Sequence, residues 1–124
     1  MDPVGFTFGD LRDLNERLLS LVRSGAKTAT CGALRDFGPD ELMPEVGRRD
    51  IALDWDGRPA LVIETTEVTI CRFCEVPEDF SLAEGEGNFG AWKQGHIGFF
   101  TRNGGFDPDM ELVCERFRLI EVLA

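Results

Sequence analysis

The residues best suited to chemistry lie in one short segment, Gly25-Ala26-Lys27-Thr28-Ala29-Thr30. Lys27 and Thr30 are three positions apart, so a helical turn would place both on one face, whereas a strand would point them to opposite sides. A lysine whose pKa is lowered by burial or by a neighbouring cation can take the proton of a hydroxyl, which then becomes a nucleophile. A cooperating pair therefore predicts a turn or a helix over residues 25–31.

The same segment also has a purely structural interpretation. At a helix end, Lys27 would interact favourably with the helix dipole, and the Thr30 hydroxyl would bind the backbone. Spacing alone favours this second interpretation, because short polar clusters are common at helix ends. A P-loop is excluded, since the two glycines that it requires are replaced by Leu21 and Ala26.

A second candidate segment is the glycine-rich stretch Ala83-Glu84-Gly85-Glu86-Gly87. Two carboxylates in a flexible loop can approach a substrate closely. One of them could act as a general acid or base, or help to bind a divalent metal ion. The alternative is an acidic loop that is simply solvated.

A third segment contains Trp92 and His96, followed by Phe99 and Phe100. Trp92 and His96 are four positions apart and would share a helix face. The aromatic faces could stack on a nucleic-acid base, and His96 could shuttle protons. Core packing is the alternative, and it is the favoured one for the two phenylalanines.

The four cysteines do not predict a metal centre or a cofactor. Cys71 and Cys74 form a single C-x-x-C pair, whereas structural zinc sites commonly use two such pairs. The other candidate ligands are Cys31, Cys114 and the only histidine, His96. Residues 69–73 also read as a strand, on which thiols three residues apart point to opposite faces. Reduced, buried, apolar cysteines are therefore expected.

Size and charge limit the classes of function. The 124 residues, 43% of them hydrophobic, fit one globular domain over residues 1–124. The formal net charge of −10 opposes non-specific binding to a phosphate backbone. A nucleic-acid role needs a small substrate or a local basic groove, for which the candidates are Arg72, Arg102, Arg116 and Arg118. We expect a cytoplasmic protein without a membrane segment or a signal peptide.

The apolar pattern predicts an α+β fold. Leucines at helical spacing predict a helix over residues 10–24, capped by Asp10 and ended by Gly25. Asp56-Gly57 between apolar runs predicts a β-hairpin. The other expected elements are a separate strand over 67–73, a short helix over 77–83, a segment of undecided type over 92–100, and one or two strands over 110–122. Strands that do not alternate with helices favour a small antiparallel β-barrel flanked by helices.

Taken in order, these segments resemble the ASCH domain family of the PUA-like superfamily. The resemblance rests on the 25–30 segment after a helix, the Asp56-Gly57 hairpin, the acidic loop and the aromatic helix, and it covers nearly the whole chain. It implies a small β-barrel with a cleft at its mouth and a link to RNA. The chain departs from many relatives at Gly32, where they carry an arginine.

The resemblance also implies roles for individual residues. Some ASCH-type proteins hydrolyse the acetyl amide of N4-acetylcytidine with a lysine, a threonine and a glutamate. By motif these are Lys27, Thr30 and Glu86, with Glu84 as the fallback for the glutamate. The remaining candidates are residues for substrate binding: Gly25, Thr28, Glu84, Trp92 and His96.

Three functions follow as hypotheses. The first is an amidohydrolase that acts on an acylated nucleoside. The second is a non-catalytic module that binds a nucleoside or short single-stranded RNA through converging basic residues. The third is a metal-dependent ribonuclease, as described for other ASCH-type proteins, in which Glu84 and Glu86 hold a divalent ion. It ranks last, because two acids in one loop make an incomplete metal site.

Overall fold

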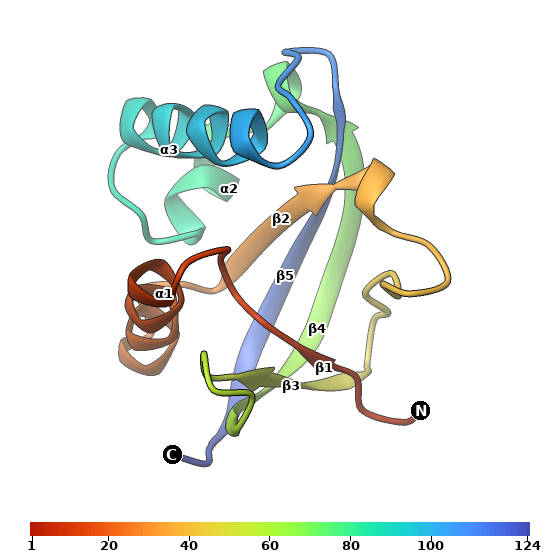
Figure 1. The fold of residues 1–124 in the computed structure, drawn as a ribbon, viewed down its shortest axis with the longest axis vertical. Helices are drawn as coiled ribbons and strands as arrows, with labels where there is room; N and C mark the ends of the chain where they lie inside the picture. Colours follow the sequence, from red (N-terminus) through yellow and green to blue (C-terminus); the bar gives the residue numbers. More distant parts are fainter.

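The computed structural model describes residues 1–124, which form a five-stranded sheet with three α-helices (Figure 1). Two short 3-10 turns lie at Leu34–Asp36 and Phe73–Glu75. The elements in chain order are β1 (Gly5–Phe6), α1 (Arg12–Ser24), β2 (Ala29–Ala33), β3 (Arg49–Leu53), β4 (Pro59–Arg72), α2 (Glu78–Ala83), α3 (Phe89–Arg102) and β5 (Glu111–Val122). No helix combines the length and the apolar character that crossing a membrane requires.

The sheet is open, with the strand order β1-β3-β4-β5-β2. Adjacent strands are antiparallel except β1 and β3, which are parallel. The expected α+β class and a barrel-like sheet flanked by helices are confirmed, although the sheet is open and includes one parallel pair, β1 with β3. The two edge strands, β1 and β2, do not pair with each other. The strand β1 has only two residues, and its one partner is β3.

The predicted hairpin is confirmed between β3 and β4. The Asp54 carboxylate accepts hydrogen bonds from the backbone N–H groups of Asp56 and Arg58, and Gly57 adopts a φ of +82°. The separate strand expected over 67–73 is instead the second half of β4. A bulge between Thr65 and Glu67 shifts the register of β4 against β5. The pairing with β5 continues on both sides of this bulge, so the two halves form one strand.

The helices agree with the sequence pattern in most respects. The helix α1 ends at Gly25, which has a φ of +83°, as predicted. Asp10 does not cap this helix, because its carboxylate accepts hydrogen bonds from Arg102 and Asn103. The short helix α2 is confirmed. The undecided segment belongs to α3, whose first turn is capped by the side chain of Asn88.

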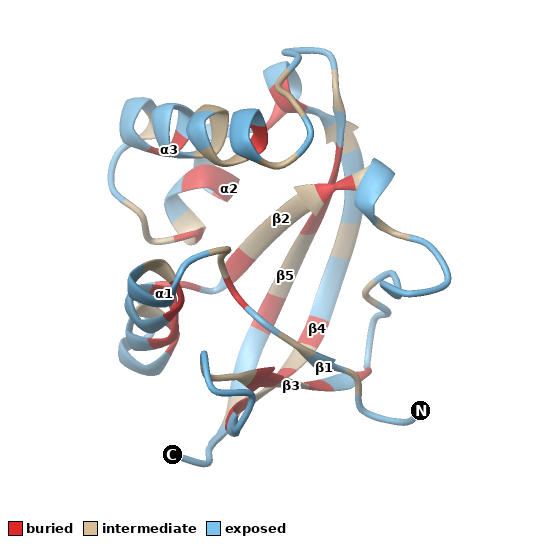
Figure 2. Cartoon of the chain, viewed as in Figure 1, coloured by how far each residue is buried: buried red, intermediate tan, exposed pale blue.

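Two hydrophobic clusters hold the helices against the sheet. The buried positions of α1 lie on the side that faces the strands (Figure 2). The first cluster joins α1 to β3, β4 and β5: Phe8, Leu18, Leu19, Val22, Ala52, Ala60, Leu61, Ile63 and Phe117. The second joins α2 and α3 to β2 and β5: Ala29, Ala33, Phe73, Val76, Phe80, Trp92, Phe100, Leu112 and Cys114. Two buried charged residues, Lys27 and Glu84, belong to the candidate site, and each is 1% exposed.

Candidate functional site

The segment after α1 is irregular for four residues and then becomes a strand. The Lys27 N–H donates a hydrogen bond to the Leu21 carbonyl oxygen at 3.1 Å, and β2 begins at Ala29. The prediction of a turn or helix over 25–31 is therefore wrong from residue 29 onward. The reason is tertiary, because residues 29–33 pair with β5 and Thr30 lies opposite Glu115 in that pairing. Lys27 precedes the strand, so strand alternation does not separate it from Thr30.

Lys27 is buried with three oxygen atoms around its ammonium group. Its side chain is 1% exposed. The Nζ atom donates to the Ala29 carbonyl oxygen at 2.8 Å and to Glu84 Oε1 at 3.2 Å, and it lies 3.9 Å from Glu86 Oε2. The Phe8 ring centroid lies 5.7 Å from the same atom. A buried ammonium is stable only with such partners, so this arrangement fixes the position of the charge.

Glu84 is the anionic centre of the site, and each of its carboxylate oxygen atoms accepts a hydrogen bond. Oε1 accepts from Lys27, and Oε2 accepts from Trp92 Nε1 at 2.7 Å. Burial by itself would raise the pKa of Glu84, but the charge of Lys27, the neighbouring imidazole of His96 and the hydrogen bond from Trp92 outweigh it and lower this pKa to about 2. The carboxylate is therefore ionised throughout the neutral range.

The lowered pKa of Glu84 predicts a specific acid sensitivity. The pKa of Glu84 falls from 4.5 to about 2 on folding, so the stabilisation is complete above pH 4.5 and is lost as the pH falls through 2. It corresponds to about 3 kcal/mol. We expect the difference in free energy of unfolding between the wild type and Glu84→Gln to shrink over this range, as measured by urea unfolding in metal-free buffer. A constant difference would contradict the assigned pKa.

Glycine at position 85 allows the acidic loop to lie against the lysine segment. Gly85 has a φ of +75°, and a Cβ atom there would lie 2.4 Å from the Ala26 carbonyl oxygen. Two residues earlier, the Ala83 carbonyl oxygen accepts a hydrogen bond from the Thr28 N–H at 2.7 Å. The close backbone approach therefore sets Glu84 and Lys27 at hydrogen-bonding distance.

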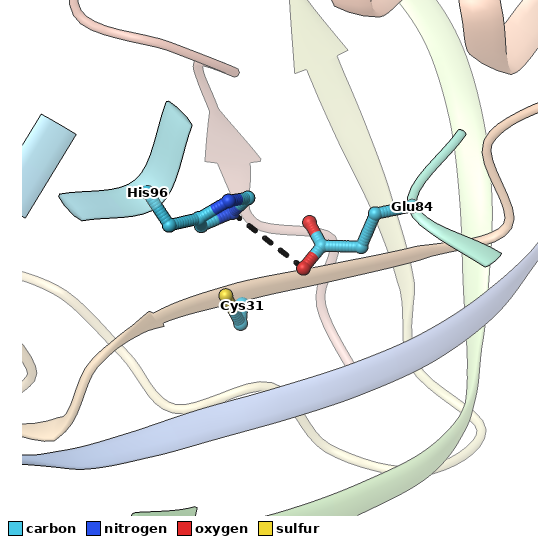
Figure 3. A group of neighbouring side chains, drawn as sticks. All are labelled: Cys31, Glu84 and His96. Carbon is cyan, nitrogen blue, oxygen red and sulfur yellow. Dashed lines mark ion pairs between the residues drawn. The ribbon is translucent and has the colours of Figure 1, made fainter. Parts of the chain in front are cut away.

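His96 and Trp92 share a face of α3, as predicted. Their rings stack with centroids 4.5 Å apart. His96 Nδ1 lies 2.9 Å from the Trp92 carbonyl oxygen, and His96 Nε2 lies 3.6 Å from Glu84 Oε2 (Figure 3). Burial would lower the pKa of His96, but the hydrogen bond and charge of Glu84, with the charge of Glu86, raise it above its usual value.

The charged residues of the site line a cleft of about 570 Å³. Its volume falls within the range of about 300 to 1,000 Å³ that is typical of small-molecule sites. Lys27, Thr30, Glu84, Glu86 and His96 all line it. No hydrogen bond joins Lys27 to Thr30, since the ammonium group bonds to the oxygen atoms named above. The structure thus brings both members of the sequence motif to one cleft without direct contact between them.

Three of the other sequence candidates lie outside the cleft. Gly25 is exposed at the end of α1, and Thr28 is exposed beside Ala83. Trp92 is 1% exposed and has the Phe73 ring stacked at 5.3 Å on one side and His96 at 4.5 Å on the other. Trp92 therefore positions Glu84 and His96, and neither of its faces is available to a base.

The two glutamates of the acidic loop have different environments. The Glu84 side chain is 1% exposed, whereas that of Glu86 is 15% exposed and forms an ion pair with Arg17 at 3.4 Å. Lys27 lies between them, within 4 Å of both. Glu84 is thus the structural partner of Lys27, and Glu86 is the carboxylate with access to a ligand in the cleft.

The arginines at the cleft are all paired with carboxylates. Arg17 pairs with Glu86, Arg48 with Asp50 at 2.7 Å, and Arg102 with Asp10 at 2.7 Å. Of the four arginines named as a possible basic patch, only Arg102 lines the cleft. The other three lie on β4 or β5 and pair with acidic residues: Arg72 with Glu75, Arg116 with Asp79, and Arg118 with Glu64. The cleft therefore offers little free positive charge to a polyanion.

Several cleft residues carry no recognisable signal in the sequence. Cys31 follows Thr30 on β2 and lines the cleft. Its burial, and to a smaller extent the charge of Glu84, raises the pKa of its thiol well above the usual value. Phe8 and the Arg48–Asp50 pair come from distant segments. At Gly32, the Phe37 ring would lie 3.3 Å from an added Cβ, so Phe37 occupies the space beside this glycine. Only the fold brings these residues together.

The comparisons with known proteins agree with this architecture. The model of the ASCH domain family matches residues 5–121. This chain belongs to the ASCH domain family. The crystal structure of an ASCH domain from Lactobacillus crispatus JV V101 is 33% identical, with a TM-score of 0.84 over 94% of this chain and 78% of that one. A protein of Enterococcus faecalis V583 is 36% identical, with a TM-score of 0.88 over 98% and 78%.

The family assignment confirms the resemblance and the PUA-like fold of this ASCH domain, with an open sheet in place of a closed barrel. No curated protein matches the chain. ASCH domains are generally considered to bind RNA. The comparisons therefore establish the family and its general association with RNA.

Proposed function

We propose that the cleft of this ASCH domain binds a nucleoside, free or exposed in short single-stranded RNA, and hydrolyses an acyl amide on its base. N4-acetylcytidine represents this substrate class. The observation that carries the proposal is the buried Lys27 ammonium, held between Glu84 and Glu86 at the wall of the same cleft as Thr30. Perturbed, buried charges in a cleft are typical of functional sites.

In this proposal the Thr30 hydroxyl attacks the acyl carbonyl carbon. Lys27 accepts the hydroxyl proton while it passes one of its own protons to Glu86, and Glu86 delivers a proton to the departing exocyclic amine. Lys27 stays cationic at the end of this relay and stabilises the oxyanion of the tetrahedral intermediate. Water then hydrolyses the acyl ester on Thr30. Glu84 remains ionised and holds Lys27 in place.

Charge favours a neutral nucleoside over a long polyanionic RNA as the ligand. The formal net charge of the chain is −10, and the arginines at the cleft are already paired with carboxylates. Contacts with many phosphates would require those pairs to open. A single nucleoside needs only stacking and a few hydrogen bonds, for which the apolar and polar side chains of the cleft are suited.

A second candidate is a module that binds RNA without chemistry. The general association of ASCH domains with RNA favours it. In that case the same cleft holds an unpaired nucleotide, and Lys27 and Thr30 contact it without forming a covalent bond. A ribonuclease with a metal ion between Glu84 and Glu86 is disfavoured, because the Lys27 ammonium already lies between these carboxylates.

Turnover of N4-acetylcytidine by the purified protein tests the proposal. We expect Thr30→Ala to lower kcat/KM by about three orders of magnitude or more, because it removes the nucleophile. Thr69→Ala is the matched control, since Thr69 is exposed on β4 outside the cleft. Turnover that survives Thr30→Ala would contradict the nucleophile, and binding without turnover by the wild type would support the second candidate instead.

A further inference from the structure

We propose that the cleft wall contains a binding site for a zinc ion, formed by Cys31 Sγ, Glu84 Oε2 and His96 Nε2. The three residues come from β2, from the C-terminal end of α2 and from α3, and their side chains point toward one another (Figure 3). One ligand atom from each lies within 4.8 Å of the other two. This site goes beyond the proposed hydrolysis, which uses neither Cys31 nor His96.

The spacing of the ligand atoms is close to that of a tetrahedral zinc site. With usual Zn–N, Zn–O and Zn–S bond lengths, tetrahedral ligand atoms lie about 3.3 to 3.6 Å apart. The separation of His96 Nε2 and Glu84 Oε2 is already 3.6 Å. A small rotation of the Cys31 side chain, which brings its Sγ atom about 1 Å closer to the other two ligand atoms, completes the three-ligand set.

The hydrogen bond at the far side of His96 orients the imidazole as a ligand. A carbonyl oxygen can only accept, so His96 Nδ1 donates its hydrogen to the Trp92 carbonyl oxygen at 2.9 Å. In the neutral imidazole the lone pair is then on Nε2, directed toward Glu84 Oε2. Metal-binding histidines usually have such a partner on the second nitrogen. Two facing lone pairs require either a proton or a cation between them.

The charges around the cluster suit a divalent cation in spite of the nearby lysine. With Cys31 as a thiolate, the ligands Cys31 and Glu84 carry two negative charges, which a divalent ion neutralises. Lys27 keeps Glu86 as a second counter-ion, and Glu86 also pairs with Arg17. Lys27 bonds to Oε1 of Glu84, and so it stays on the side of the carboxylate away from Oε2. Lys27 and the metal ion can therefore share Glu84.

The donor set selects a borderline transition-metal ion over magnesium or calcium. Thiolate and imidazole are ligands of zinc, whereas magnesium and calcium prefer oxygen atoms. Three protein ligands leave a fourth tetrahedral position. Cys31, Glu84 and His96 all line the cleft, so this position faces the space where a ligand would bind.

Titration of the metal-free protein with Co²⁺, followed by absorption spectroscopy, tests the site without any substrate. We expect d–d bands in the visible range and a thiolate-to-cobalt charge-transfer band in the near ultraviolet, both abolished when Zn²⁺ is added. Cys31→Ser should remove the charge-transfer band. Cys74→Ser is the matched control and should keep it, because Cys74 is exposed and outside the cluster.

His96→Gln provides a second, independent variant. We expect it to weaken Co²⁺ binding by about tenfold or more, because it removes a ligand, and circular dichroism will show that both variants are folded. Absence of cobalt bands in the wild type would overturn the proposal. A charge-transfer band that persists in Cys31→Ser would also overturn it, since the thiolate would then come from another cysteine, such as the Cys71–Cys114 pair with sulfur atoms 3.8 Å apart. Neither result depends on hydrolysis.

Discussion

Replacing Glu84 with glutamine is expected to lower the free energy of unfolding by about 3 to 5 kcal/mol. The substitution leaves the Lys27 ammonium, 1% exposed, without its buried counter-ion. An uncompensated buried charge costs far more than the lost ion pair contributes, because the ammonium cannot regain its hydration. Equilibrium unfolding in urea at pH 7 measures this loss directly.

The neighbouring glutamate provides the matched control for this prediction. Glu86→Gln removes the same charge from the same loop, but Glu86 is partly exposed and lies 3.9 Å from Lys27 Nζ. We expect it to change the free energy of unfolding by about 1 kcal/mol or less. The double variant Lys27→Met with Glu84→Leu should recover most of the stability that Glu84→Gln loses, because no buried charge remains. Equal effects of Glu84→Gln and Glu86→Gln would contradict the assigned roles.

Gly85→Ala is expected to be the second strongly destabilising change, by about 3 kcal/mol. About 1 to 2 kcal/mol comes from the left-handed backbone conformation, which disfavours a Cβ atom. The remainder comes from a contact of 2.4 Å between that Cβ and the Ala26 carbonyl oxygen, which forces the two loops apart. We also expect lower activity in the folded fraction, since the same shift separates Glu84 from Lys27. Urea unfolding and the turnover assay measure the two effects.

Gly57→Ala separates the contribution of backbone strain from that of the clash. Gly57 has a φ of +82°, close to that of Gly85, but nothing lies within 4 Å of an added Cβ. We expect it to cost about 1 to 2 kcal/mol and to leave turnover unchanged. If the two variants were equally stable and equally active, the close approach of the two loops would not position the site.

The parts of the fold that local sequence determines were predicted correctly. The left-handed Gly25 ends α1, and the Asp56-Gly57 turn joins β3 to β4. Both features depend on the conformational preferences of a few neighbouring residues. The predictions failed where tertiary pairing decides the structure. Asp10 bonds to Arg102, which is 92 positions away, and residues from Ala29 onward join β5 in place of a turn.

The candidate site was only partly accessible from the sequence, for the same reason. The motif identified Lys27 and the acidic loop, but the spacing of Glu84 and Glu86 does not reveal which of them faces inward. That distinction depends on Trp92, whose indole N–H holds the Glu84 carboxylate. Cys31 was considered only as one scattered thiol, because its proximity to Glu84 and His96 exists only in the folded chain.

The most direct test of the central claim, that a nucleoside binds in the cleft beside Lys27, is a backbone NMR titration of the wild-type protein with N4-acetylcytidine at a pH where turnover is slow. We predict that the largest amide shift changes fall on cleft residues, namely Phe8, Thr30, Cys31, Glu86 and His96. Amides on the exposed parts of β4, such as Thr66 and Thr69, should be unaffected. Shift changes confined to those β4 residues, or none at saturating concentration, would contradict the account.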